Sequence, residues 1–341
     1  MGKVMLEGWR NRRLFDWYHP EKAAPIDTES LREWGDRVIG RDAVDWLLST
    51  PASAFFFWDS HQTPWWFSVS LAWAVARGQW SVMVPEGGMG AVPQALARNL
   101  KIRLNTTVHR AEFEPGGHVR LRTEGPAGWE TVEADRVVLA TPAPVTLALL
   151  QNPDEALGFE EATLLRSTRY TSNLTTAVAY DGPPEERAYG VSVPLASGSP
   201  LAAIGWEHLK DPRRVPAGKG LGVLMPTHSY SVQRRDAPDD AIGAELIAAA
   251  HAVYPGSRFE PLFHRVQRWE YAMPVQYPGW SRTLAGALSA PPREGRLVFT
   301  CGDYWLGPNT ELALVSGLRA AVAVLRSLGR MSGKIDELDL L

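Results

Sequence analysis

Near its C-terminus the chain reads LVFTCGDYWLGPNTELALVSGLRAA over residues 297–321. The apolar, β-branched beginning predicts a buried strand from Arg296 to Cys301. A glycine-rich connection from Gly302 to Pro308 follows, and the small and apolar residues behind it predict a helix from about Thr310 to Leu328. This order places the carboxylate of Asp303 at the end of a strand and shortly before a helix N-terminus.

Such an arrangement has a specific chemical use. A carboxylate and the free N–H groups of a helix N-terminus can together hold a polyol and an electron-rich ring carbonyl. Asp303 suits a ribityl hydroxyl, and the N–H groups of Leu312 and Ala313 suit the negative charge that develops at the N1/C2 carbonyl of a reduced flavin. The pattern indicates flavin binding, although Asp303 taken alone could equally be a helix-capping side chain.

Two further segments also predict a strand followed by a turn and a helix. Glu86 to Leu96 reads EGGMGAVPQAL, behind a short apolar run from Trp80 to Val84, which predicts a strand, a turn and a helix. Val137 to Ala140 predicts a buried strand that ends in TPAP before a short helix at 145–150. Taken singly, the first could be any tight turn and the second any buried strand.

In their order and spacing, the three segments resemble the cofactor-binding elements of the flavin-containing amine oxidase superfamily. The layout is most similar to protoporphyrinogen oxidases and to carotenoid and squalene desaturases, and the resemblance extends from about Trp34 to Leu328. It implies an α/β (mixed α+β) fold of amine oxidase type, with FAD as cofactor and a substrate domain of a mixed sheet plus helices. The backbone of Val108 would contact adenine. The cofactor-binding residues implied are Gly87, Gly88, Met89, Gly90, Val108, Ala140, Thr141, Pro142, Gly302, Asp303, Glu311, Leu312 and Ala313.

The sequence departs from this family in one respect. Such enzymes open with a βαβ unit whose G-x-G-x-x-G turn seats the pyrophosphate, and no G-x-G-x-x-G occurs in these 341 residues. We expect either a truncated gene start or a separate polypeptide or neighbouring domain that supplies the unit. We also expect the isolated chain to bind FAD weakly or not at all.

The predicted domains are discontinuous. Residues 1–80 form the helical part of the substrate domain, 81–150 part of the FAD domain, 151–290 the substrate domain with a mostly antiparallel sheet, 291–330 the last FAD-domain strand, loop and helix, and 331–341 a tail. Strand 296–301 should lie beside Val137 to Ala140. One mixed sheet is predicted from Asn173–Tyr180, Tyr189–Pro194, Leu201–Glu207, Gly220–Pro226 and His264–Trp269, with an apolar cavity between it and the N-terminal helices.

Aromatic residues suggest where substrate would lie. Eight of the 14 tryptophans precede residue 75, which fits either core packing or a ring-lined substrate cavity. Four side chains close to the cofactor segments are candidates for lining the substrate site, with ordinary packing as an equal alternative: Trp269, Tyr271, Tyr304 and Trp305. Since a flavin transfers hydride itself, no acid or base is required, and no catalytic residue is assigned.

The predicted activity is an FAD-dependent oxidation of an apolar or ring-containing substrate, with O2 or a quinone-like acceptor. Porphyrinogens, carotenoids, squalene-type hydrocarbons and amines all remain open as substrates. The alternative is an FAD-free remnant of the fold that acts as a non-catalytic binding or partner subunit. The missing phosphate loop favours this alternative, and the segment from Asp303 to Ala321 favours the enzyme.

Composition excludes several other classes of protein. The formal net charge is −3 with scattered charges, so no nucleic-acid partner is expected. The single cysteine, Cys301, excludes internal disulfides and cysteine-based metal sites, and no other metal pattern is present. The N-terminus lacks a signal-peptide core, which predicts a cytoplasmic protein. A lipophilic substrate and the Trp-rich opening are compatible with peripheral membrane contact.

Overall fold

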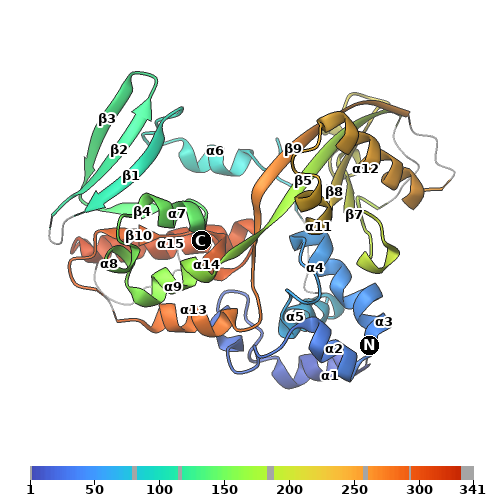
Figure 1. The fold of residues 1–341 in the computed structure, drawn as a ribbon, viewed down its shortest axis with the longest axis horizontal. Helices are drawn as coiled ribbons and strands as arrows, with labels where there is room; N and C mark the ends of the chain where they lie inside the picture. The colour runs from blue at the N-terminus through green and yellow to red at the C-terminus, as the bar shows by residue number, and fades with distance from the viewer. Residues whose placement is uncertain are drawn as a thin grey trace. The chain divides into compact units, whose positions relative to one another are not determined.

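The computed structural model describes residues 2–78, 83–113, 117–182, 188–255, 260–291 and 293–331 (Figure 1). Part of the predicted strand Trp80–Val84, part of the predicted turn at 115–117 and most of the tail lie outside these ranges. The chain divides into two compact units, each assembled from three separate segments. The first comprises residues 1–12, 28–91 and 170–278, and the second comprises 13–27, 92–169 and 279–341.

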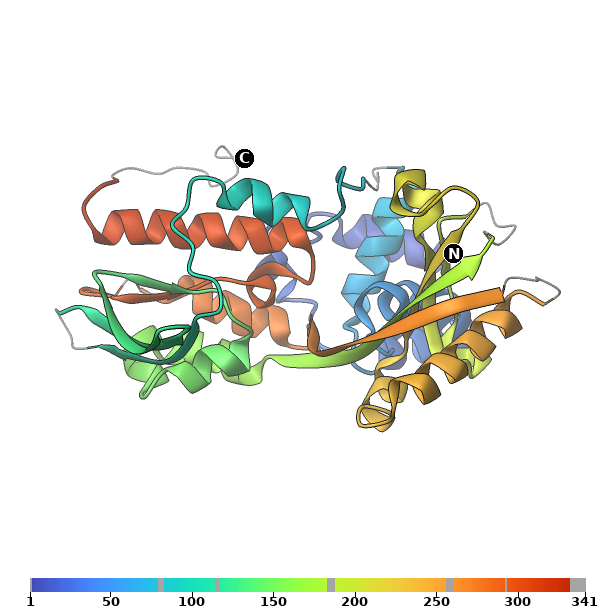
Figure 2. The same ribbon diagram turned by 90° about the horizontal axis from the view of Figure 1, so that it is seen from above.

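The first unit contains a five-stranded sheet. Its strand order is β6 (Gly190–Ser192), β7 (Leu201–Trp206), β8 (Gly220–Pro226), β5 (Arg169–Asp181) and β9 (Glu260–Val275). The pairs β6–β7, β7–β8 and β5–β8 are antiparallel. Figure 2 shows β5 in yellow-green and β9 in orange running side by side. The prediction that these five segments share one sheet is confirmed.

The first unit also contains helices. They are α1 (Gly2–Asn11), α2 (Leu31–Val38), α3 (Arg41–Ala43), the π-helix η2 (Val44–Leu48), α4 (Ser49–Phe56), α5 (Trp65–Ala76), α10 (Glu207–Lys210), α11 (His228–Gln233) and α12 (Asp239–Val253), with 3-10 turns η3 (Leu195–Ser197) and η4 (Pro212–Arg214). In α12, Ile242, Leu246 and Ala250 recur every four residues and are fully buried on the side that contacts β7, β8 and β9. Helix α4 contacts β6 and β7.

Helix α2 could be capped by Asp27 on residue type alone, but Ser30 caps it, in a capping box with Glu33. The Ser30 hydroxyl accepts from the Glu33 N–H at 3.2 Å, and the Glu33 carboxylate accepts from the Ser30 N–H at 2.9 Å. Asp27 instead accepts from the N–H of Ser281 at 2.7 Å, and thereby caps a helix 254 positions away in the sequence.

Two helices of the first unit approach closely. Helix α5 is apolar on all sides, and its residues from Trp65 to Leu71 are buried. Gly8 of α1 lies over Trp73 of α5, where an added Cβ would be 2.6 Å from the indole ring. Trp34 and Trp65 stack with ring centroids 5.3 Å apart. The tryptophans that precede residue 75 therefore serve in large part as packing between helices.

The second unit has two smaller sheets. An antiparallel meander joins β1 (Thr107–Phe113), β2 (Val119–Gly125) and β3 (Gly128–Ala134), and a parallel pair joins β4 (Val137–Leu139) to β10 (Val298–Thr300). The predicted pairing of the last strand with Val137–Ala140 is confirmed. The alternating residues from Ile102 to Val108 predict a strand, but the first meander strand begins only at Thr107. Asn105 adopts a positive φ of 52°, and the residues before it have no partner strand in the described structure.

The second unit also contains helices. They are α6 (Ala91–Ala97), α7 (Ala143–Leu149), α8 (Pro153–Leu157), α9 (Phe159–Ser167), α13 (Trp280–Ser289), α14 (Asp303–Leu306) and α15 (Thr310–Ser327), with the 3-10 turn η1 (Pro20–Ala23). Leu164 of α9 and Leu284 of α13 are fully buried against each other. Within the described ranges, no helix is both long and apolar enough to cross a membrane.

Candidate functional site

The candidate site begins where β4 and β10 end. Val298 pairs with Val137 and Thr300 with Leu139, and the N–H of Cys301 donates to the Leu139 carbonyl at 3.1 Å. Because the strands are parallel, the segments that follow them leave from the same edge of the sheet. The structure therefore brings the predicted residues 140–142 together with residues 302–303.

Asp303 is the first residue of α14. Its carboxyl is largely buried, and no basic side chain in the described chain forms an ion pair with it. Burial raises the pKa of Asp303 to about 6, and the backbone N–H of Tyr304 opposes this shift. A carboxylate held in this way is a strong acceptor for a hydroxyl group supplied by a ligand.

Gly302 fixes the direction in which the chain leaves β10. An added Cβ at Gly302 would lie 2.7 Å from the Tyr304 ring, so only glycine fits there. The Gly302 N–H donates to the Ser316 hydroxyl at 2.9 Å, and that hydroxyl donates to the Ala313 carbonyl at 2.7 Å. These two hydrogen bonds tie the loop that carries Asp303 to the second turn of α15.

The N-terminus of α15 differs from the sequence prediction. The N–H groups of Leu312 and Ala313 were expected to be free for a flavin, but Asn309 uses both. Its side-chain oxygen accepts from Leu312 at 2.8 Å, and its carbonyl accepts from Ala313 at 3.1 Å. In the described structure the first-turn N–H groups without an assigned acceptor are those of Thr310 and Glu311. The N-terminus of α15 therefore still offers free N–H donors and a positive dipole end, but at Thr310 and Glu311 instead of Leu312 and Ala313.

The Glu311 side chain has a structural partner. It accepts a hydrogen bond from the Tyr18 hydroxyl, which raises the pKa of Tyr18. Arg319, two turns later on α15, donates to the Tyr18 carbonyl at 3.1 Å. Both contacts fasten the segment around Tyr18 to α15, so the Glu311 carboxylate is engaged in holding the unit together.

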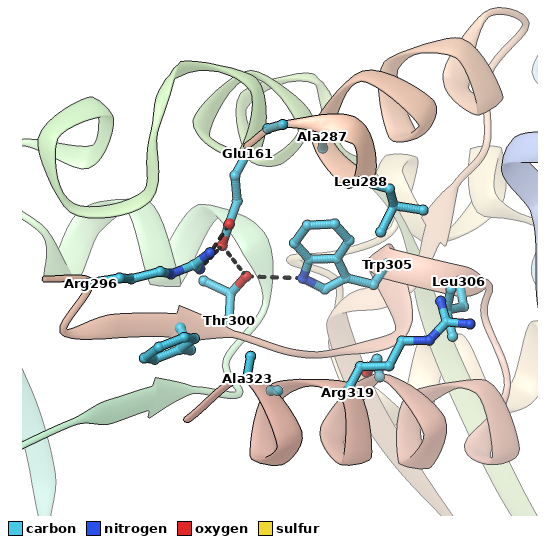
Figure 3. Close-up of a pocket in the computed structure, with 13 residues that line it drawn as sticks. Glu161, Ala287, Leu288, Arg296, Thr300, Trp305, Leu306, Arg319 and Ala323 are labelled. Carbon is cyan, nitrogen blue, oxygen red and sulfur yellow. Dashed lines mark hydrogen bonds and ion pairs between the residues drawn. The ribbon is translucent and has the colours of Figure 1, made fainter. Parts of the chain in front are cut away.

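A buried polar network lies behind the loop (Figure 3). Arg296 donates to both oxygens of Glu161, at 2.9 and 2.8 Å, and Thr300 donates to Glu161 at 2.7 Å. The Trp305 indole donates to the Thr300 hydroxyl at 2.9 Å. Burial raises the pKa of Glu161, and the Arg296 guanidinium opposes that shift.

This network lines a cavity of about 230 Å³ between α9, α13, β10 and α15. Sequence reasoning did not find Glu161 or Arg296, since the two residues lie 135 positions apart and neither belongs to a motif. Glu161 holds the Thr300 hydroxyl, which accepts from the indole of Trp305 in α14, the helix that begins with Asp303.

The remaining predicted residues are distributed over both units. Gly87 and Gly88, with φ of 80° and 86°, form a tight turn with Met89 and Gly90 in the first unit. Val108 lies on β1 in the second unit, at an irregularity in the pairing with β2. Thr141 bonds through its hydroxyl to that of Thr146 at 2.8 Å, which fixes the turn between β4 and α7.

Among the predicted substrate-lining side chains, Trp269 and Tyr271 lie on β9 in the first unit and are 51% and 37% exposed. Tyr304 and Trp305 belong to the second unit. Tyr304 is only 1% exposed, so its ring packs beneath Gly302. Trp305 lines the cavity of the Glu161 network.

Comparison with known proteins gives one family match, described as flavin containing amine oxidoreductase, over residues 15–325. The chain belongs to this family. Members share a flavin-dependent oxidoreductase chemistry, and the resemblance inferred from the sequence is thereby confirmed.

Solved structures with the same fold include two amine oxidases and a mutase. Cyclohexylamine oxidase from Brevibacterium oxydans IH-35A has a TM-score of 0.67 and 15% identity, with 93% of this chain and 72% of that chain covered. Reduced UDP-galactopyranose mutase has a TM-score of 0.65 and 14% identity, with 94% and 72% covered. Putrescine oxidase bound to putrescine has a TM-score of 0.63 and 15% identity, with 91% and 70% covered. These similarities confirm the predicted fold class.

The residues at the strand ends fit the flavin that the family implies. Asp303 offers a largely buried acceptor without a basic partner, and the tip of α15 offers N–H donors. At Gly317, an added Cβ would meet nothing within 4 Å, so this face of α15 leaves space for a neighbouring group. The carboxylate, the helix tip and the small residue together match a polyol linked to an electron-rich ring.

Proposed function

We propose that the carboxyl ends of β4 and β10 bind the flavin of FAD and that the chain takes part in the oxidation of an apolar or ring-containing substrate. Binding to this chain alone should be weak, because no G-x-G-x-x-G turn occurs in these residues to seat the pyrophosphate. The observation that carries the proposal is the largely buried carboxylate of Asp303, which has no ion-pair partner in the described structure and adjoins the tip of α15. The family match over residues 15–325 supports a flavin cofactor. The Asp303 carboxylate and the N–H groups at the N-terminus of α15 suit a flavin that carries a ribityl chain.

The residues of the chain would divide the binding of the cofactor between them. Asp303 would accept a hydrogen bond from a ribityl hydroxyl. The first-turn N–H groups of α15 would face the N1/C2 side of the ring, where they would stabilise the negative charge that develops when the flavin is reduced. Thr141 and Pro142 would flank the ring from the neighbouring strand end. When bound, a flavin accepts a hydride from a substrate C–H bond and passes electrons to O2 or a quinone-like acceptor.

Several buried contacts would keep this geometry in place without touching the cofactor. Ser316 holds the Gly302 N–H, and Asn309 caps α15. Trp305, which is part of α14, anchors this helix to β10 by its hydrogen bond to Thr300. Since the reaction needs a C–H bond placed over the ring and protected from water, rigid support of Asp303 and the tip of α15 is the main contribution of the second unit.

The decisive experiment titrates FAD into the purified protein and follows the visible absorbance and fluorescence of the flavin. Replacing Asp303 by Asn removes one charge-assisted hydrogen bond, so affinity should fall about tenfold to a hundredfold. Asp135→Asn is the matched control, because this exposed carboxylate lies in the same unit just before the amino end of β4. It should leave FAD affinity unchanged.

Equal FAD affinity in the wild type and in Asp303→Asn would contradict the proposed site. A wild type that binds no added FAD would instead favour the non-catalytic partner subunit. Where FAD binds, anaerobic addition of substrate tests the substrate class. Cyclohexylamine, with an apolar ring, should bleach the flavin faster than putrescine, which is charged at both ends. The opposite order would contradict an apolar or ring-containing substrate.

A further inference from the structure

The first unit contains a second concave site, separate from the strand ends of the second unit. We propose that the cavity between η2, α4 and α5 binds a neutral, lipophilic small molecule that carries one hydrogen-bonding group. The proposal does not depend on flavin binding, because every lining residue belongs to the first unit. It rests on the walls of the cavity, on one buried hydroxyl and on the geometry of η2.

The cavity has a volume of about 510 Å³, which lies in the range of small-molecule sites. Eight of its ten lining residues are apolar and none is charged. Transfer of a charged group into such walls would cost its hydration without any compensating partner, so charged ligands are excluded. The lining residues are Leu47, Leu48, Pro51, Phe55, Ser68, Leu71, Ala72, Val75, Ala76 and Tyr189.

Ser68 supplies the one polar group deep in this wall. It is 3% exposed, and its hydroxyl has no hydrogen-bond partner in the described structure. A buried hydroxyl without a partner is unfavourable, and native structures seldom retain one unless a ligand or an ordered water satisfies it. Packing within α5 does not require a hydroxyl at this position, so we attribute it to a ligand.

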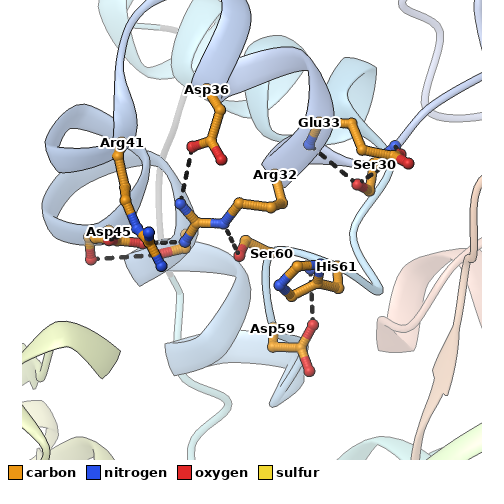
Figure 4. A network of polar contacts seen from close by, with 10 residues as sticks. Ser30, Arg32, Glu33, Asp36, Arg41, Asp45, Asp59, Ser60 and His61 are labelled. Carbon is orange, nitrogen blue, oxygen red and sulfur yellow. Dashed lines mark hydrogen bonds and ion pairs between the residues drawn. The ribbon is translucent and has the colours of Figure 1, made fainter.

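The π-helical segment η2 shapes the opposite wall. It presents Leu47 and Leu48 to the cavity, and π-helical turns are rare and frequent at functional sites. Arg32 of α2 fixes η2 by an ion pair with Asp45, as Figure 4 shows. Its guanidinium also donates to Asp36 at 3.0 Å. The ion pair between Arg32 and Asp45 thus holds the π-helical wall of the cavity in place.

Ser68 also distinguishes a small molecule from other occupants. A bilayer or a flat protein surface would cover the exposed rim, where Leu47 and Phe55 are 56% and 50% exposed, but would leave the deep hydroxyl unsatisfied. A molecule that enters the cavity with an apolar ring or chain and one N–H, hydroxyl or carbonyl group satisfies both the walls and the hydroxyl.

The probe for this site is N-phenyl-1-naphthylamine, an uncharged aromatic amine with one N–H group whose fluorescence rises in apolar surroundings. We expect saturable binding to the full chain. Ala72→Trp places a large ring in the cavity and should lower affinity at least about tenfold. Ala74→Trp, on the same helix and also half-buried but outside the cavity lining, should bind the probe as the wild type does.

Ser68→Ala tests the hydroxyl itself. Loss of one neutral hydrogen bond should weaken binding of the probe about threefold to tenfold, while thermal unfolding shows that the variant is folded. Equal probe affinity in Ala72→Trp and the wild type, or no binding to the wild type, would overturn the proposal. So would a wild type that ignores the probe but sediments with phosphatidylcholine vesicles, since the rim would then be a membrane contact.

Discussion

At the scale of single residues, Asp303 should leave a signature in the pH dependence of stability. Burial raises its pKa from 3.8 to about 6 in the folded chain. As the pH rises, the Asp303 carboxyl therefore loses its proton in the unfolded chain before it does so in the folded chain. The contribution of Asp303 to stability is full below about pH 4 and is lost as the pH rises through about 6. Asp303→Asn removes this dependence. The stability of the wild type relative to Asp303→Asn should fall by up to about 3 kcal/mol over that window.

Urea unfolding at several pH values measures this difference. Asp135→Asn serves again as the control for loss of an exposed carboxylate. A wild type and an Asp303→Asn variant whose free energies of unfolding change in parallel between about pH 4 and pH 6 would show that the carboxyl is not held in a buried environment.

The Glu161–Arg296 pair makes a second prediction at this scale. Arg296→Met leaves the buried Glu161 without its guanidinium, and loss of one partner of a buried ion pair costs about 3 to 5 kcal/mol. The loss should be smaller in acid, because burial already raises the pKa of Glu161 and protonation removes the uncompensated charge. Urea unfolding at about pH 5 and about pH 8 provides the comparison.

The double variant Glu161→Gln/Arg296→Met is the control for that experiment. With no buried charge left, it should recover part of the stability lost at the higher pH. An Arg296→Met variant that loses the same free energy at both pH values would mean that packing, and not the buried charge, explains the effect.

At the scale of elements, the capping box of α2 can be tested directly. Ser30→Ala removes the acceptor for the Glu33 N–H and should lower the free energy of unfolding by about 1 kcal/mol. Ser30→Asp keeps an acceptor at the same position and should recover most of that loss. Thermal unfolding monitored by circular dichroism gives both values, and no change in Ser30→Ala would contradict the assigned cap.

Local sequence explains several elements without tertiary information. The apolar spacing of Ile242, Leu246 and Ala250 predicts a helix at α12, and the alternation over Gly220–Pro226 predicts β8. The start of the strand predicted over Ile102–Val108 could not be placed in this way, because alternation alone does not show whether a partner strand is present.

At the scale of the whole molecule, each unit is built from three separate stretches of sequence. A fragment of residues 92–169 contains β1–β4 and α7–α9 but lacks β10, α13 and α15. It would expose Leu139, Leu164 and Leu165, which are buried in the intact chain. We expect this fragment to lack cooperative unfolding and dispersed NMR signals. Addition of a second fragment, residues 279–341, should restore some of both.

Cooperative unfolding of the 92–169 fragment alone would contradict this division of the chain. Such a result would mean that β4 does not need β10 as its partner. The prediction follows from topology, because the partners in that parallel pair lie more than 150 positions apart.

The sequence by itself determined the strand, loop and helix that carry Asp303, and their resemblance to a flavin-binding family, because strand alternation, helix periodicity and motif spacing are local properties. Tertiary structure decided which groups are free and which are engaged. Asn309 takes the N–H groups assigned to the cofactor, and Asp27 caps α13 instead of α2. Glu161 meets Arg296 across 135 positions. Hydrogen bonds between residues so distant in the chain leave no periodic trace, so only the folded chain shows them.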